Sequence, residues 1–149
     1  MAARLQQSAG LGTIGAVVTL IGTFLPWLRS GARNRSSYTI FELVDRLGFA
    51  PGGVVSASLR MWPIVPLVLV IAVVALWVPL PGRVPGWPVM IAVGSAAAWI
   101  GGTGVAVLLA PTDGLLRTGP GPVVTIVGTV LLGVGAAVRR RGSAASAAA

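Results

Sequence analysis

Four long stretches of the chain contain no ionisable residue, and they constrain the fold more than any other feature. They cover residues 9–28, 61–80, 88–110 and 122–138. The hydrocarbon core of a bilayer is about 30 Å thick, and about 20 apolar residues in a helix cross it. The stretches meet or approach that length. The sequence therefore predicts an all-α polytopic membrane protein with four transmembrane helices.

The overall composition leaves no room for a soluble domain. Hydrophobic residues make up 55% of the 149 residues, charged residues make up 9%, and the mean hydropathy is +0.90. A soluble domain carries about 25% charged residues. Because four helices and their connections use nearly the whole length, we expect one membrane domain over residues 1–149.

Few side chains are available for catalysis or metal binding. Cys, His and Lys are absent, which excludes disulfides, thiolate chemistry and Cys/His sites for metals or haem. The acidic residues are Glu42, Asp45 and Asp113, and all three lie in connections between the apolar stretches. No His, Cys or Lys can act with them as acid, base or nucleophile. We therefore expect no enzyme, no catalytic residue, no cofactor and no metal.

The basic residues point to lipid rather than to nucleic acid. All 11 are arginines, and they give the chain a net charge of +8 and a pI near 12.0. They border the apolar stretches, where each contributes about 1 kcal/mol of attraction to anionic headgroups. We expect a bilayer with anionic lipids as a partner and no nucleic acid.

The connections carry proline and glycine beside the apolar stretches. Pro26 is expected to close the first span, with Trp27 at the membrane interface. The short turn at 82–87 is expected to join the second and third spans as an antiparallel hairpin, so that the chain forms two hairpins. Arg139 is expected to reach the headgroups from the end of the fourth span, and residues 142–149 to form a disordered tail.

Four spans place both termini on one side of the membrane, but the arginine count is nearly balanced between the sides. Positive charge close to span ends marks the cytoplasmic side. The cluster at 139–141 directly follows the last span, so we expect cytoplasmic termini and an extracytoplasmic loop at 29–60, in a bacterial plasma membrane. The opposite orientation stays open because Arg29 and Arg60 also lie at span ends. A cleaved signal peptide is the less favoured interpretation of the first stretch, because that stretch has full membrane length.

The loop at 29–60 contains the pattern of a short amphipathic helix. Thr39 and Glu42 are spaced as a capping box, and Gly48 is expected to end the helix. Glu42 and Arg46 are spaced to pair on its outer face. One apolar stripe of this helix is a candidate interaction surface, formed by Ile40, Phe41, Val44 and Leu47. We expect the stripe to pack on the chain's own bundle, and docking on a partner is the alternative.

Small residues recur at helical spacing and suggest close helix packing. In the third span they form the stripe Gly94, Ala98 and Gly102, which we expect to pack within the bundle or to dock another membrane protein. Trp99 lies near the middle of that span and is expected to pack across a glycine groove. Residues 10–15 match G-x-G-x-x-G, but no strand precedes them, so we interpret these glycines as helix-packing positions rather than a nucleotide site. Similar ridges of small residues occur in the first and fourth spans: Gly15, Thr19 and Thr23, and Thr125, Thr129, Gly133 and Ala137.

The segment Phe24-Leu25-Pro26-Trp27, followed by Gly31, Ser36-Ser37 and the loop helix, resembles uncharacterised four-span membrane proteins of actinobacteria. The resemblance implies a four-helix membrane fold in the cell envelope and no known activity.

Two classes of function are consistent with these patterns. The favoured one is a non-catalytic accessory, assembly or scaffold subunit of a larger envelope complex, or a homo-oligomer. The alternative is a small transporter or channel component. Small multidrug transporters are also four-span proteins, but they use a membrane-embedded carboxylate, and here every acid lies in a loop.

Overall fold

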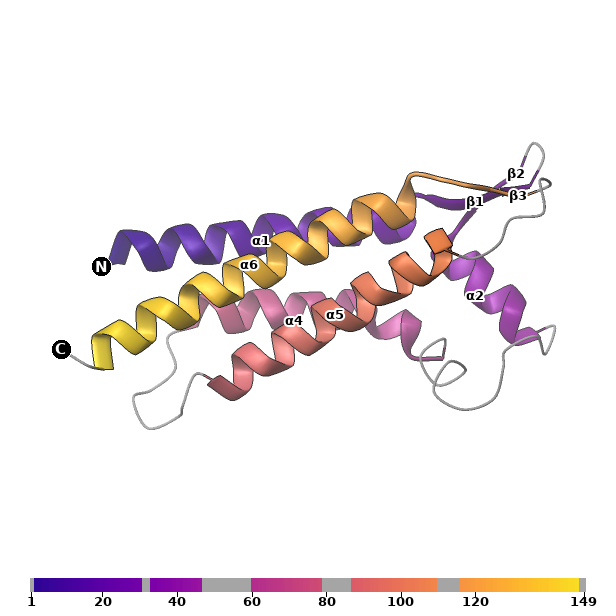
Figure 1. Ribbon diagram of the computed structural model, residues 1–149. Helices are drawn as coiled ribbons and strands as arrows, with labels where there is room; N and C mark the ends of the chain where they lie inside the picture. Colours follow the sequence, from indigo (N-terminus) through magenta and orange to yellow (C-terminus); the bar gives the residue numbers. More distant parts are fainter. Residues whose placement is uncertain (1, 31–32, 47–59, 79–86, 110–115, 148–149) are drawn as a thin grey trace.

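The computed structural model describes residues 2–30, 33–46, 60–78, 87–109 and 116–147, which form helices and one small sheet (Figure 1). Both termini lie at one end of the long helices, and the short helix α2 and the sheet lie at the other end. We call these the terminal end and the sheet end. The elements in chain order are α1 (Ala2–Phe24), β1 (Pro26–Ser30), β2 (Arg33–Ser36), α2 (Ser37–Arg46), η1 (Trp62–Ile64), α4 (Val65–Trp77), α5 (Trp87–Leu109), β3 (Leu116–Thr118) and α6 (Gly121–Ala147).

Three of the described helices are long and apolar enough to cross a membrane. Their apolar segments are Gln6–Phe24 in α1, Pro88–Leu109 in α5 and Gly121–Arg139 in α6. These segments confirm the prediction of a mostly helical chain whose apolar helices are suited to a membrane. The fourth apolar stretch holds a shorter apolar helix, Trp62–Trp77, whose α-helical part has 13 residues and is therefore about 20 Å long.

The first helix ends at Phe24, before the end of the apolar stretch at residue 28. Pro26 closes it, as predicted, because proline disfavours a helical conformation in the preceding residue. The amide of Leu25 still donates to the Ile21 carbonyl (3.1 Å). Strand β1 then begins at Pro26, so the last residues of the apolar stretch lie in a strand rather than in the helix.

The three-stranded sheet is absent from the all-α prediction, which was wrong for this part of the chain. Its antiparallel order is β2-β1-β3. Arg29 in β1 lies opposite Asn34 on one side and Arg117 on the other. Because β3 comes from the connection before α6, this pairing depends on the fold and leaves no local pattern in the sequence.

The last helix is longer than expected. Helix α6 continues to Ala147, through most of the segment 142–149 that was expected to be disordered. An existing helix extends without a new nucleation step, and the alanines of this segment are the residues that favour helix most.

The closest helix pair consists of α1 and α6, which run antiparallel with their glycines in contact. A Cβ at Gly22 would lie 2.5 Å from the Thr125 backbone nitrogen, and one at Gly135 would lie 2.7 Å from the Gly12 nitrogen. A Cβ at Gly128 would overlap the Thr19 backbone. Only glycine lets the two backbones approach this closely.

The first glycine motif therefore serves helix packing, as predicted. At Gly12 an added Cβ would overlap Leu76, and at Gly15 it would overlap the Leu132 backbone nitrogen. Gly10, the first glycine of the motif, has open space beside it. Gly15 therefore allows direct contact with the α6 backbone, and Gly12 gives room to the Leu76 side chain.

Helix α4 packs mainly against α1 and makes few contacts with α5, its expected hairpin partner. Arg139 of α6 connects to the end of α4: its guanidinium donates to the carbonyls of Ala75 (3.1 Å) and Val78 (2.9 Å). The prediction that Arg139 reaches the headgroups did not include these bonds to the end of α4. The last carbonyls of a helix have no partner within the helix, and a cation satisfies them well.

Candidate functional site

An aromatic cluster joins four elements at the sheet end. The ring centroids of Phe41 and Trp62 are 4.6 Å apart, those of Trp27 and Trp62 are 5.4 Å apart, and those of Trp62 and Trp99 are 5.9 Å apart. All three pairs meet edge to face, the arrangement that aromatic quadrupoles favour. The cluster therefore holds β1, α2, η1 and α5 together.

The polar atoms inside this cluster are hydrogen-bonded to the protein. The Trp62 indole donates to the Ser37 hydroxyl (3.0 Å), which donates in turn to the Thr23 carbonyl (2.6 Å). The Trp27 indole donates to the Gly22 carbonyl (2.9 Å). Trp27 was expected at the membrane interface with a hydrated N–H, but its side chain is fully buried.

Helix α2 starts at Ser37, two residues before the predicted cap. Thr39 therefore lies inside the first turn, and the predicted capping box was wrong; the Thr39 hydroxyl lies 3.3 Å from that of Ser36. The predicted ion pair between Glu42 and Arg46 is present at 2.6 Å and is exposed. The predicted helix end at Gly48 lies outside the described residues.

The described half of the α2 stripe packs on the chain itself. Phe41 is buried in the aromatic cluster, and Ile40 is partly buried against the core. The side chain of Val44 and the whole of Leu47 lie outside the described residues. Packing on the chain's own bundle is thus confirmed for Phe41, which is unavailable to a partner.

Tyr38 of α2 packs against Phe24, with ring centroids 5.1 Å apart. Its hydroxyl is buried without a hydrogen-bond partner among the described residues. Burial raises the pKa of the Tyr38 hydroxyl above its usual range. The phenol therefore stays protonated at neutral pH.

The expected ridge on α5 does not pack within the bundle. Gly94 and Gly102 have no atom within 4 Å of an added Cβ, and Ala98 is exposed. The contact with α6 is made one position earlier in the helix, because a Cβ at Gly101 would lie 2.7 Å from the Thr129 hydroxyl oxygen. Of the two expectations for this stripe, packing within the bundle is not what the structure shows, and docking on another membrane protein stays a prediction.

Beside this face, α5 and α6 form a shallow groove of about 360 Å³. Gly133 of α6 also borders it and has open space where a side chain would be. The groove combines the exposed small residues of α5 with the neighbouring surface of α6. It is lined by Gly94, Ala97, Ala98, Gly101, Gly102, Val105, Ile126, Thr129, Val130 and Gly133.

The Trp99 side chain is not part of this groove. It was expected to pack across a glycine groove, but it meets the edge of Trp62 and is half-buried. Of the four candidate residues in the third span, only Gly94, Ala98 and Gly102 lie together on an exposed surface.

Several polar side chains of the spanning helices form hydrogen bonds within the chain, whereas the Thr125 hydroxyl of α6 is buried without a hydrogen-bond partner among the described residues. Thr19 donates to the Gly15 carbonyl (2.8 Å), and Thr103 donates to the Trp99 carbonyl (2.9 Å). The Trp77 indole donates to the Thr13 hydroxyl (2.8 Å). Within the described residues, no group of three or more acidic side chains could hold a metal ion.

Comparison with known proteins gives no match to a protein family, to a curated protein or to a solved structure.

Proposed function

We propose that this chain is a non-catalytic, four-span protein of the bacterial plasma membrane, which serves as an accessory or scaffold subunit of a larger membrane complex. The groove between α5 and α6 carries the proposal, because it leaves three glycines open on the outside of the bundle. We assign it to a transmembrane helix of the partner protein.

The position of α4 supports a fourth span. One side of it is buried in the bundle, at Val65, Leu69 and Leu76. On the other side, Leu67 and Val70 are each more than half exposed. An apolar helix exposed in this way fits hydrocarbon as its solvent. At the terminal end, Arg139 donates hydrogen bonds to the carbonyls at the end of α4, which have no partner within that helix.

The size and chemistry of the α5–α6 groove favour a helix as its occupant. Gly94, Ala98 and Gly102 lie on successive turns and present almost no side chain. Lipid gives helices no hydrophobic reason to associate, so association depends on close van der Waals contact between backbones. A facing helix that lies in the groove makes such contact over three turns.

The polar and ionisable residues of the chain favour a scaffold over a transporter. The four apolar stretches contain no ionisable residue that could couple transport to protons. The threonines of the described spans that make hydrogen bonds use carbonyls of their own helices. These bonds leave such side chains to packing rather than to a solute pathway.

A matched pair of leucine substitutions tests this proposal by co-purification from native membranes in mild detergent. Gly102→Leu places its Cβ in open space and its side chain in the groove, so the bundle should stay intact while the partner is lost. Gly101→Leu overlaps Thr129 and should destabilise the bundle itself. Gly10→Leu lies in open space on α1 and should retain both bundle and partner.

The identity of the captured protein distinguishes an accessory subunit from a homo-oligomer. A photo-crosslinker at Ala98 should give a product with a different membrane protein, and Gly102→Leu should abolish that product. A product of two copies of this chain would replace the accessory role with homo-oligomerisation. Full partner retention by Gly102→Leu would overturn the assignment of the groove.

A further inference from the structure

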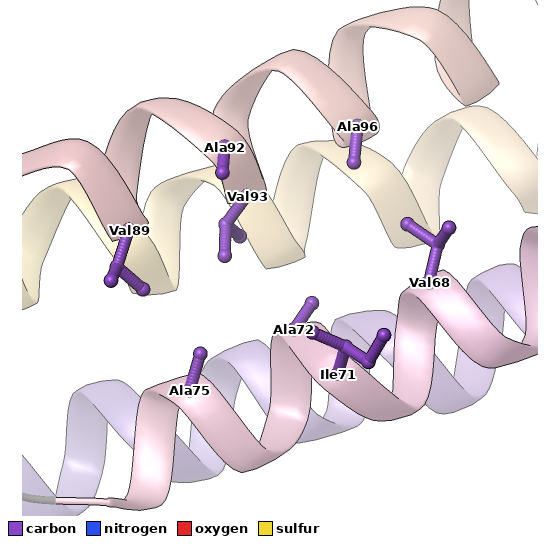
Figure 2. A pocket seen from close by; sticks show the side chains of 8 residues that line it. All are labelled: Val68, Ile71, Ala72, Ala75, Val89, Ala92, Val93 and Ala96. Carbon is purple, nitrogen blue, oxygen red and sulfur yellow. The ribbon is translucent and has the colours of Figure 1, made fainter.

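A second groove lies between α4 and α5, on the side of α5 away from the small-residue face. Its volume is about 300 Å³. Figure 2 shows the side chains of the two helices pointing toward one another across the gap, with Ala75 and Val89 at its wide part. All the lining residues are apolar: Val68, Ile71, Ala72, Ala75, Val89, Ala92, Val93 and Ala96.

Water fits this groove poorly. A bound water molecule needs two to four polar partners, and none of the lining side chains has a polar atom. An empty groove would leave its lining without dispersion contacts on one side. An apolar occupant supplies those contacts.

The shape of the groove indicates an extended apolar chain. Its lining residues run from Val68 to Ala75 on α4 and from Val89 to Ala96 on α5. Each segment rises about 10 Å along its helix. The groove is thus elongated in the direction of the helices, which is also the direction of lipid acyl chains.

A cation lies at the terminal end of the same groove. Ala75 lines the groove with its side chain and accepts a hydrogen bond from Arg139 with its carbonyl (3.1 Å). The second bond of Arg139 goes to Val78, farther toward the terminal end (2.9 Å). A guanidinium has five N–H donors in a planar fork and binds phosphate oxygens well. At this end of the helices it is placed at the depth of lipid headgroups.

We propose that the α4–α5 groove binds one acyl chain of an anionic phospholipid, with the lipid phosphate on Arg139. The apolar lining suits an acyl chain, and the Arg139 guanidinium beside Ala75 suits an anionic headgroup. This site shares no lining residue with the α5–α6 groove and does not depend on the accessory role. The bound lipid fills the space that the sparse contact between α4 and α5 leaves open.

Native mass spectrometry of the delipidated full-length chain in detergent tests the site. The probes are dioleoyl phosphatidylglycerol, dioleoyl phosphatidylcholine and glycerol 3-phosphate. The chain should retain one phosphatidylglycerol with about tenfold preference over phosphatidylcholine. Both lipids carry a phosphate, but the choline cation of phosphatidylcholine offsets the phosphate charge and lies close to the Arg139 guanidinium. Glycerol 3-phosphate, which lacks acyl chains, should not be retained; its retention would mean a free-phosphate site and overturn the lipid assignment.

Three variants separate the parts of the site. Ala92→Phe fills the groove, leaves Arg139 in place and should abolish retention of both lipids. Arg139→Gln should remove the preference for phosphatidylglycerol. Val70→Phe is a matched control on the exposed side of α4, outside the groove, and should bind lipid like the natural chain.

Two outcomes would overturn the proposal. One is equal retention of the two lipids by the natural chain. The other is unchanged retention by Ala92→Phe, which would assign the lipid to the general surface of the bundle. Because Arg139 also holds the end of α4, the result with Ala92→Phe decides the matter if Arg139→Gln fails to fold.

Discussion

Trp62 donates its indole N–H to the hydroxyl of Ser37, across 25 positions of the chain. The Ser37 hydroxyl then donates to the Thr23 carbonyl, so one buried side chain connects the beginning of α2 to the end of α1 and to η1. A buried donor without a partner costs more than the bond itself contributes. This small network therefore orients α2 on the end of the bundle.

Removing the Ser37 hydroxyl should destabilise the sheet end. Ser37→Ala leaves the Trp62 N–H buried without a partner, at a cost of about 1–3 kcal/mol in the free energy of unfolding. Thr39→Ala is the control: Thr39 is exposed inside the helix, so its loss should cost no more than about 0.5 kcal/mol. Denaturant titration in detergent, followed by tryptophan fluorescence, measures both. Equal effects of the two changes would show that the network does not hold α2.

Two glycines of α6 should respond to alanine in opposite directions. Gly128→Ala places a Cβ against the backbone of Thr19, and such overpacking costs about 1–3 kcal/mol. Gly133→Ala adds a Cβ in open space and should stabilise the helix by up to about 1 kcal/mol. Thermal unfolding of both variants in the same detergent compares them. A stabilised Gly128→Ala variant would rule out the close contact between α1 and α6.

The orientation in the membrane can be tested because the natural chain has no cysteine. With cytoplasmic termini, an impermeant maleimide on intact cells should label Ser36→Cys, at the sheet end. Ser143→Cys, in α6, should become labelled only after the membrane is opened. The reverse pattern would place the sheet and α2 in the cytoplasm.

The sequence alone was sufficient to locate the helical segments that fit a membrane. Hydropathy is a local property, and hydrocarbon forces each backbone segment to satisfy its own hydrogen bonds, so an apolar run of sufficient length becomes a helix. The ion pair of Glu42 and Arg46 could likewise be predicted, because four residues along a helix bring two side chains to one face.

Only the tertiary structure decided which face of each helix packs. Small residues lie on more than one face of α5, and spacing did not distinguish Gly101, which meets Thr129, from Gly102, which is open. In α6 the packed glycines recur every seven positions at 121, 128 and 135, a spacing that the ridge of every fourth residue obscured.

The contact of Arg139 with the end of α4 and the pairing of β1 with β3 join distant segments. Such contacts depend on the partner's position in space, and a local pattern carries no information about that position.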